Sequence, residues 1–126
     1  MSKKTVVILG ASADRGKFSN KAVRAYVQQG WDVYPVNPRG GTIEGLKVHA
    51  TIDEIPAKID RVTVYLPPPV AVKALASIAK IKPAELFINP GAESDELVKR
   101  AEELGLEPIF ACSIIDLGVT PAEFAE

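Results

Sequence analysis

The chain has 126 residues, of which 47% are hydrophobic and 25% are charged, with a net charge of −1. This composition is typical of one globular domain with its own core, and the balanced charge disfavours a nucleic-acid-binding surface. The single cysteine, Cys112, excludes an intrachain disulfide, and no apolar run approaches the about 18 residues that cross a bilayer. With no signal peptide before the first apolar run, we expect a soluble cytoplasmic protein without a membrane or nucleic-acid partner.

Apolar runs alternate with segments of helical periodicity along the chain. We expect strands over 5–9, 31–36, 46–49 (a short edge strand), 61–66, 85–89 and 107–111, and helices over 19–29, 70–80 and 94–104. Thr51 and Glu54 have capping-box spacing, which predicts a helical turn over 51–56. The segment from residue 113 is expected to be irregular, with one turn near 121–124.

This alternation predicts an α/β fold: a three-layer, doubly wound parallel sheet of the Rossmann kind, forming a single domain over residues 1–126. In such sheets, ligands bind beyond the carboxyl ends of the strands. The segments that follow the expected strands are therefore the candidate ligand contacts.

The first of these segments contains Gly10, Ala11, Ser12, Ala13, Arg15, Lys17 and Ser19. Small residues, cations and a helix N-terminus with exposed N–H groups form an anion site, so we expect a phosphate-bearing ligand there. Gly10 and Gly16 have five residues between them, which fits neither G-x-G-x-x-G nor the P-loop. Phe18 also follows Lys17 at the position where a P-loop has the hydroxyl residue that holds Mg²⁺. The alternative for Gly10 is a tight strand-to-helix turn that contacts no ligand.

The second segment contains Asn37, Pro38 and Arg39. NAD-binding domains usually have an acidic residue here for the ribose diol, whereas a guanidinium attracts a ribose phosphate. NADP and coenzyme A both carry such a phosphate. Arg39 as an ordinary solvated charge is the alternative.

The third segment is Leu66-Pro67-Pro68-Pro69. Its prolines predict a rigid apolar shelf with few N–H donors, suited to an adenine face or an aliphatic arm. The same prolines are also typical of the first positions of a helix.

These segments together resemble the CoA-binding domain family, whose small members are similar to the N-terminal domain of the succinyl-CoA synthetase alpha subunit. The resemblance covers nearly the whole chain. It rests on Gly10-Ala11-Ser12 with Lys17 and Ser19, on Pro35-Val36-Asn37-Pro38, on Tyr65-Leu66-Pro67-Pro68, and on Asn89-Pro90-Gly91-Ala92 with the late Cys112.

The resemblance implies that coenzyme A or an acyl-CoA is the ligand. It implies that residues 10–13, Arg15, Lys17 and Ser19 hold the diphosphate region, that Arg39 contacts CoA, and that Leu66, Pro67 and Pro68 flank the adenine or pantetheine. Asn37, Pro38 and Gly91 complete the expected site. The phosphorylated histidine of the synthetase lies in a second domain, so its chemistry is not expected here.

No catalytic set is apparent, because the sequence has one histidine, His49, and one cysteine. We expect His49 to be a surface or packing residue. Cys112 is either a small buried residue or a thiol able to form a mixed disulfide with CoA.

Three functions stay open: a noncatalytic CoA or acyl-CoA binding protein, acting as sensor or carrier; an NADP-binding accessory domain; and an interaction subunit of a partner acyl-CoA synthetase. The first is favoured. The sequence leaves the preferred acyl group and any homo-oligomeric state open.

Overall fold

The computed structural model describes residues 3–125. The strands are β1 (Thr5–Leu9), β2 (Asp32–Val36), β3 (Thr42–Ile43), β4 (Leu46–Lys47), β5 (Arg61–Val64), β6 (Glu85–Ile88) and β7 (Ile109–Phe110). The helices are α1 (Phe18–Gln28), α2 (Pro68–Ile81), α3 (Asp95–Glu103) and the short α4 (Ser113–Asp116), with 3₁₀ turns η1 (Ile52–Glu54) and η2 (Pro121–Phe124). Among the described residues, no helix is long and apolar enough to cross a membrane.

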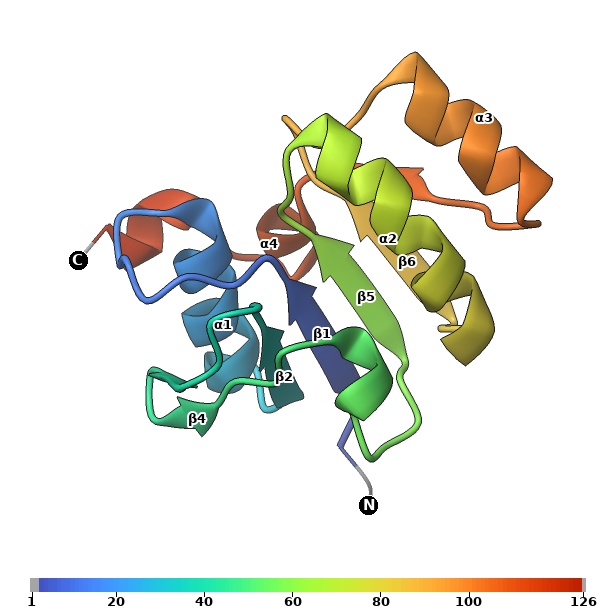
Figure 1. The fold of residues 1–126 in the computed structure, drawn as a ribbon. Helices are drawn as coiled ribbons and strands as arrows, with labels where there is room; N and C mark the ends of the chain where they lie inside the picture. The colour runs from blue at the N-terminus through green and yellow to red at the C-terminus, as the bar shows by residue number, and fades with distance from the viewer. Residues whose placement is uncertain (1–2, 126) are drawn as a thin grey trace.

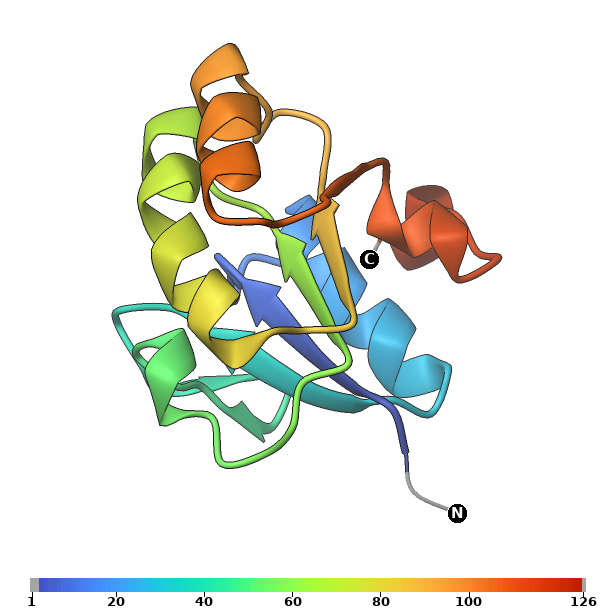
Figure 2. The same ribbon diagram turned by 90° about the vertical axis from the view of Figure 1, so that its right-hand side faces the viewer.

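Five strands form one parallel sheet in the order β2-β1-β5-β6-β7. Helices α2 and α3 cover one face, and α1 and α4 lie on the other, which gives the three layers visible from the side in Figure 2. The predicted doubly wound, Rossmann-like sheet is confirmed (Figure 1).

Burial explains why the first strand is apolar throughout. All five residues of β1 are buried, because β1 is flanked by β2 and β5 and covered on both faces. One core, which includes Val7, Val62 and Leu75, lies on the α2 and α3 face. A second core, which includes Ile8 and Tyr26, lies on the α1 face.

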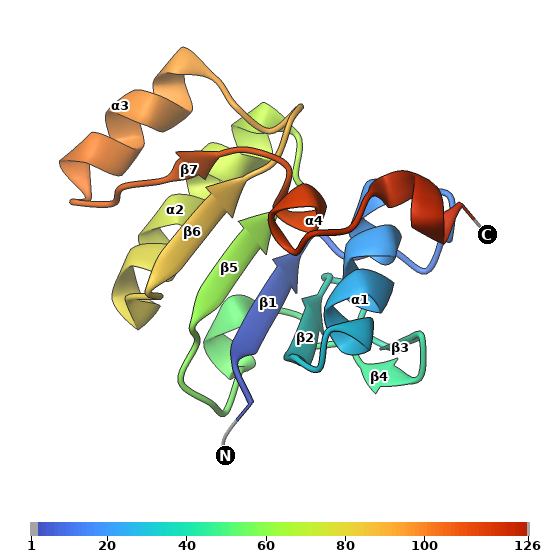
Figure 3. The same cartoon turned by 180° about the vertical axis from the view of Figure 1, so that it is seen from behind.

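The winding of the sheet reverses beside β1. From β1 the chain passes through α1 to β2 on one side, and β5 then pairs with β1 on the other side. Figure 3 shows the carboxyl ends of these neighbouring strands pointing the same way. A crevice for ligand is expected at such a reversal.

The segment between β2 and β5 differs from the prediction in two ways. The predicted strand over 46–49 is confirmed only in part: β4 covers Leu46–Lys47 but pairs antiparallel with β3 in a separate hairpin, and His49 makes an isolated bridge to Val36. The predicted Thr51 capping box is also wrong: the Thr51 side chain makes no cap, and Glu54 accepts a hydrogen bond from the Ala50 N–H instead. Both differences arise from local contacts: the turn between β3 and β4 is formed by Glu44 and Gly45, which both have positive φ, and the amide that Glu54 accepts from lies four residues away.

The C-terminal segment is more ordered than predicted. Residues 113–116 form α4, while the predicted turn near 121–124 is confirmed as η2, which has a capping box between Thr120 and Glu123. The last strand is shorter than expected, with two residues in β7.

A buried arginine ties α4 to the sheet. The Arg61 guanidinium forms ion pairs with Glu85 and Asp116, both at 2.9 Å, and donates to the Tyr26 hydroxyl at 3.1 Å. The Tyr26 hydroxyl in turn hydrogen-bonds the hydroxyl of Ser113 in α4. Arg61 is 7% exposed, so these partners compensate the cost of burying its charge.

Gly10 ends β1 in a conformation that only glycine adopts without strain. Its φ is +91°, and a Cβ built there would lie 2.5 Å from the Tyr65 carbonyl oxygen at the end of β5. The absence of a side chain therefore allows the chain to turn directly against the neighbouring strand.

We predict that Gly10→Ala lowers the free energy of unfolding by about 3 kcal/mol, because it adds a backbone clash to the strain of a positive φ. Gly30→Ala is the matched control, since Gly30 has a φ of +84° and a Cβ there would meet nothing within 4 Å. We expect the control to cost about 1 kcal/mol in urea denaturation. Equal losses for the two variants would contradict the close approach at Gly10.

Candidate functional site

A cleft of about 600 Å³ opens at the carboxyl ends of β5 and β6, beside the start of α1. We call it the α1 cleft. It is lined by Gly16, Lys17, Phe18, Ser19, Tyr65, Leu66, Pro67, Asn89, Pro90, Gly91, Ala92, Cys112 and Ile114. The segments after β1, β5 and β6 and the start of α4 therefore meet around one cavity.

The start of α1 presents unpaired N–H groups to this cleft. Lys17 is the N-cap residue and provides no side-chain cap, and the first turn of α1 has no acidic residue. Among the described residues, the N–H groups of Phe18 and Ser19 have no hydrogen-bond acceptor. Unpaired amides with the positive end of a helix dipole favour an anion at this place.

Several N–H groups of the loop before α1 already donate hydrogen bonds within the protein. The N–H groups of Gly10 and Ala11 both donate to the Val36 carbonyl, at 3.1 Å each. The N–H of Asp14 donates to the Ser12 hydroxyl, and that of Gly16 to the Asp14 carboxylate. The amides of Gly10 and Ala11 therefore anchor the loop to β2.

The other two long helices begin differently. The α2 N-terminus is formed by Pro67, Pro68 and Pro69, which have no N–H groups. The α3 N-terminus is capped by the Ser94 hydroxyl, which accepts from the Leu97 N–H at 3.0 Å. Of these three helices, α1 alone combines unpaired N–H groups in the described residues with a first turn that has neither a capping side chain nor an acidic residue, whereas the first turn of α3 carries Asp95 and Glu96.

A second cleft, of about 260 Å³, lies between α2, η1 and the ends of β1 and β2. We call it the α2 cleft. It is lined by Leu9, Gly10, Val36, Pro38, Ala50, Thr51, Ile52, Asp53, Leu66, Val70, Lys73, Ala74 and Ser77. Leu66 lines both clefts, so they adjoin at the end of β5.

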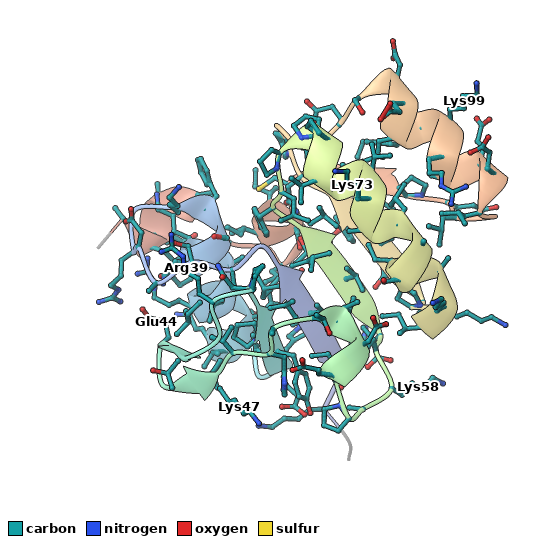
Figure 4. The ribbon with its side chains drawn as sticks, in the orientation of Figure 1. Arg39, Glu44, Lys47, Lys58, Lys73 and Lys99 are labelled. Atoms are coloured by element: carbon teal, nitrogen blue, oxygen red, sulfur yellow. The ribbon has the colours of Figure 1, made fainter. Side chains whose placement is uncertain are left out.

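Besides Lys17, three cations lie near this edge, and they differ in whether they have an ion-pair partner. Arg15 forms an ion pair with Glu44 at 3.6 Å. Arg39 and Lys73 are both exposed, and the described residues provide neither with an ion-pair partner. Figure 4 shows Arg39 on the loop after β2 and Lys73 on α2.

Asn37 holds the loop that follows β2. Its side-chain amide donates to the Ala11 carbonyl at 2.7 Å, and its side-chain oxygen accepts from the Arg39 N–H at 2.8 Å. Asn37 therefore connects the loops after β1 and β2. Its side chain positions the backbone of Arg39.

Asn89 has a similar structural role beneath the α1 cleft. This buried residue donates to the Thr63 hydroxyl at 2.6 Å and the Val64 carbonyl at 3.0 Å, and accepts from the Ser113 N–H at 2.9 Å. It thereby fixes the start of α4, and with it the half-buried Cys112, against β5 and β6.

Tyr65 contributes a buried hydroxyl to the same wall. The oxygen lies near Thr63 and Cys112 but has hydrogen-bond geometry to no described residue. Burial raises the pKa of this hydroxyl far above its ordinary value, so it stays protonated and can donate.

The structure gathers some of the predicted site residues and separates others. Lys17, Ser19, Leu66, Pro67 and Gly91 line the α1 cleft, and Gly10, Pro38 and Leu66 line the α2 cleft. The remaining predicted residues line neither cleft: Ala11, Ser12, Ala13, Arg15, Asn37, Arg39 and Pro68.

The predicted site residues omitted several lining residues, among them Phe18 and Ile114 in the α1 cleft, and Ile52 and Lys73 in the α2 cleft. Phe18 had a detectable signal, since it is a large apolar residue between Lys17 and Ser19. Lys73 had none, because it lies five residues inside a helix and reaches the cleft only through packing of α2.

Residues 4–118 match the profile of the CoA binding domain. The chain is 29% identical to the alpha subunit of an ADP-forming acetate–CoA ligase I from Pyrococcus furiosus, over 95% of this chain and 29% of the relative. It is 32% identical to a trans-feruloyl-CoA synthase from an unknown prokaryotic organism, over 61% of this chain and 11% of the relative. The chain thus spans less than a third of the length of these curated relatives.

Solved structures show the same fold at nearly full length. A conserved hypothetical protein from Pyrococcus furiosus has a TM-score of 0.80 at 29% identity, covering 91% of this chain and 99% of its own. A Thermus thermophilus protein has a TM-score of 0.81 at 26% identity, covering 90% of this chain and 87% of its own. With the family profile spanning all the elements that build both clefts, the chain belongs to the CoA-binding domain family.

Proposed function

We propose that this domain binds coenzyme A or an acyl-CoA across the two adjoining clefts. The observation that carries the proposal is the N-terminus of α1, where unpaired amides of Phe18 and Ser19 and the exposed Lys17 meet the α1 cleft. The CoA diphosphate binds there, because this place combines N–H donors, a positive dipole end and a cation.

The adenosine end occupies the α2 cleft. Pro38, Ile52 and Leu66 offer apolar contacts to a purine ring, and Lys73 lies in the same lining. Arg39 directly follows Pro38, and its guanidinium has no partner among the described residues. A ribose phosphate at this position gains a charge-assisted hydrogen bond, whereas NAD, which lacks the phosphate, does not.

The pantetheine arm occupies the α1 cleft and extends toward Cys112. The wall formed by Leu66, Pro67 and Pro90 has few N–H donors and suits an aliphatic chain. Because Leu66 lines both clefts, one ligand can pass from the α2 cleft into the α1 cleft over this side chain.

We propose that the domain itself is noncatalytic. His49, the single histidine of the sequence, packs against the Tyr34 ring at 5.8 Å between centroids and lines neither cleft. Residues 3–125 bring together no group of three or more His, Cys, Asp and Glu side chains that could hold a metal ion. The test is incubation with acetyl-CoA and butyryl-CoA, in which we expect no release of thiol above the uncatalysed rate.

A second candidate is that the domain serves a partner acyl-CoA synthetase. It is favoured by the curated relatives, in which the matching stretch belongs to a ligase subunit or to a longer synthetase. Analytical ultracentrifugation with a ligase subunit from the same organism tests it, and a stable complex that needs no CoA supports it.

Arg39→Ala is predicted to weaken CoA binding about tenfold in calorimetry while leaving 3′-dephospho-CoA affinity within about twofold, because the guanidinium pairs with the ribose phosphate. Lys99→Ala on α3 (Figure 4) is the control, since Lys99 lines neither cleft, and it should change neither affinity. If Lys73→Ala abolishes the affinity difference between CoA and 3′-dephospho-CoA and Arg39→Ala does not, then Lys73 on α2 binds the ribose phosphate instead. NADPH that outcompetes CoA would favour the NADP alternative.

Saturating desulfo-CoA, which has no thiol, is predicted to slow alkylation of Cys112 by iodoacetamide about fivefold or more, because the arm covers the sulfur in the α1 cleft. Cys112 is the single cysteine of the sequence, so mass spectrometry reads one site. Lys17→Ala should lose the protection at the same ligand concentration. An unchanged alkylation rate with ligand bound, as verified by calorimetry, would place the arm elsewhere.

A further inference from the structure

The walls of the α1 cleft are chemically one-sided. Among the described residues that line it, Lys17 is the single charged side chain, and it belongs to the N-terminal rim of α1. The other walls are dominated by apolar groups from four segments of the chain: Phe18, Tyr65, Leu66, Pro67, Pro90, Ala92 and Ile114.

We propose that the α1 cleft accepts an apolar acyl chain, so that the preferred ligand is an acyl-CoA with an uncharged aliphatic or aromatic acyl group, and that Phe18 is a specificity-determining residue. This inference rests on the proposed function and extends it to the class of acyl group.

Phe18 is unusual for its position in the cleft. It is 58% exposed, belongs to neither hydrophobic core, and begins the helix whose N-terminus faces the ligand. The Lys21 ammonium lies 5.1 Å from its ring centroid. A single exposed aromatic side chain is ordinary on a protein surface, but this one shares a cavity with Leu66 and Ile114. An apolar ligand group that packs against Phe18 removes water from this exposed ring, whereas Ile114 lines the cavity but is already buried.

A charged acyl group has no partner in this cleft. Lys17 is the one cation in the described lining and is engaged by the diphosphate in the proposed complex. The carboxylate of a succinyl or malonyl group would therefore enter an apolar wall without an ion-pair partner, which is unfavourable. Free CoA, which ends in a thiol, leaves the apolar contacts of Phe18 and Ile114 unused.

Calorimetry with CoA, acetyl-CoA, hexanoyl-CoA and succinyl-CoA tests the inference. We expect hexanoyl-CoA to bind about tenfold more tightly than acetyl-CoA, since four added methylenes contact an open rather than an enclosed apolar wall. We expect succinyl-CoA to bind no more tightly than free CoA. Equal affinities for acetyl-CoA and hexanoyl-CoA, or tighter binding of succinyl-CoA, would overturn the acyl assignment while leaving the CoA proposal intact.

Phe18→Ala tests the residue. We expect the variant to lose most of the tenfold preference for hexanoyl-CoA over acetyl-CoA, and Phe18→Leu to restore it, because leucine supplies apolar area without a ring. Phe110→Ala is the matched control, since Phe110 is 48% exposed on β7 and lines neither cleft. A preference that survives in Phe18→Ala would remove Phe18 from the proposal. Failure of the unmodified protein to bind any CoA ester would overturn the proposed function and this inference together.

Discussion

The close approach of Gly10 to the end of β5 determines the geometry of the sheet edge at which both clefts open. With 2.5 Å between a hypothetical Cβ and the Tyr65 oxygen, the turn after β1 can run against the neighbouring strand only because residue 10 has no side chain. The amides of Gly10 and Ala11 then bond to the Val36 carbonyl of β2, which anchors the turn across three adjacent strands. The following loop and α1 start from this anchored point, so the α1 N-terminus reaches the cleft beyond β5 and β6.

At this edge of the sheet, the charged and N–H groups lie at the start of α1, and apolar groups lie at the start of α2. At α1, a helix start without a capping side chain or acidic residue leaves N–H groups and Lys17 for an anion. At α2, consecutive prolines remove the donors and present carbon instead. A molecule with a charged centre and an apolar arm matches this arrangement, because each part meets a wall of the corresponding polarity. The same contrast would disfavour a ligand that is polar throughout.

A buried polar network holds the floor of the α1 cleft in place. Arg61, Tyr26 and Ser113 connect β5, α1 and α4, and Asn89 connects β6 to the backbone of Ser113. The guanidinium of Arg61 also lies 5.0 Å from the Trp31 ring centroid and 4.5 Å from that of Phe87. Because removal of one partner leaves a buried charge or donor unsatisfied, this network favours a single arrangement of α4 and of the cleft wall that contains Cys112 and Ile114.

The sequence by itself determined the α/β class, the order of the long helices and main strands, and the edge of the sheet at which the two clefts open. Its apolar runs, helical periodicity and glycine and proline positions report these features locally. Tertiary structure decided the helix α4, the pairing of the Gly10 and Ala11 amides with the Val36 carbonyl, and the entry of Lys73 into the α2 cleft. Each of these depends on contacts between segments distant in the chain, which no local pattern encodes, because hydrogen-bond acceptors and packing neighbours are supplied only when the strands and helices come together.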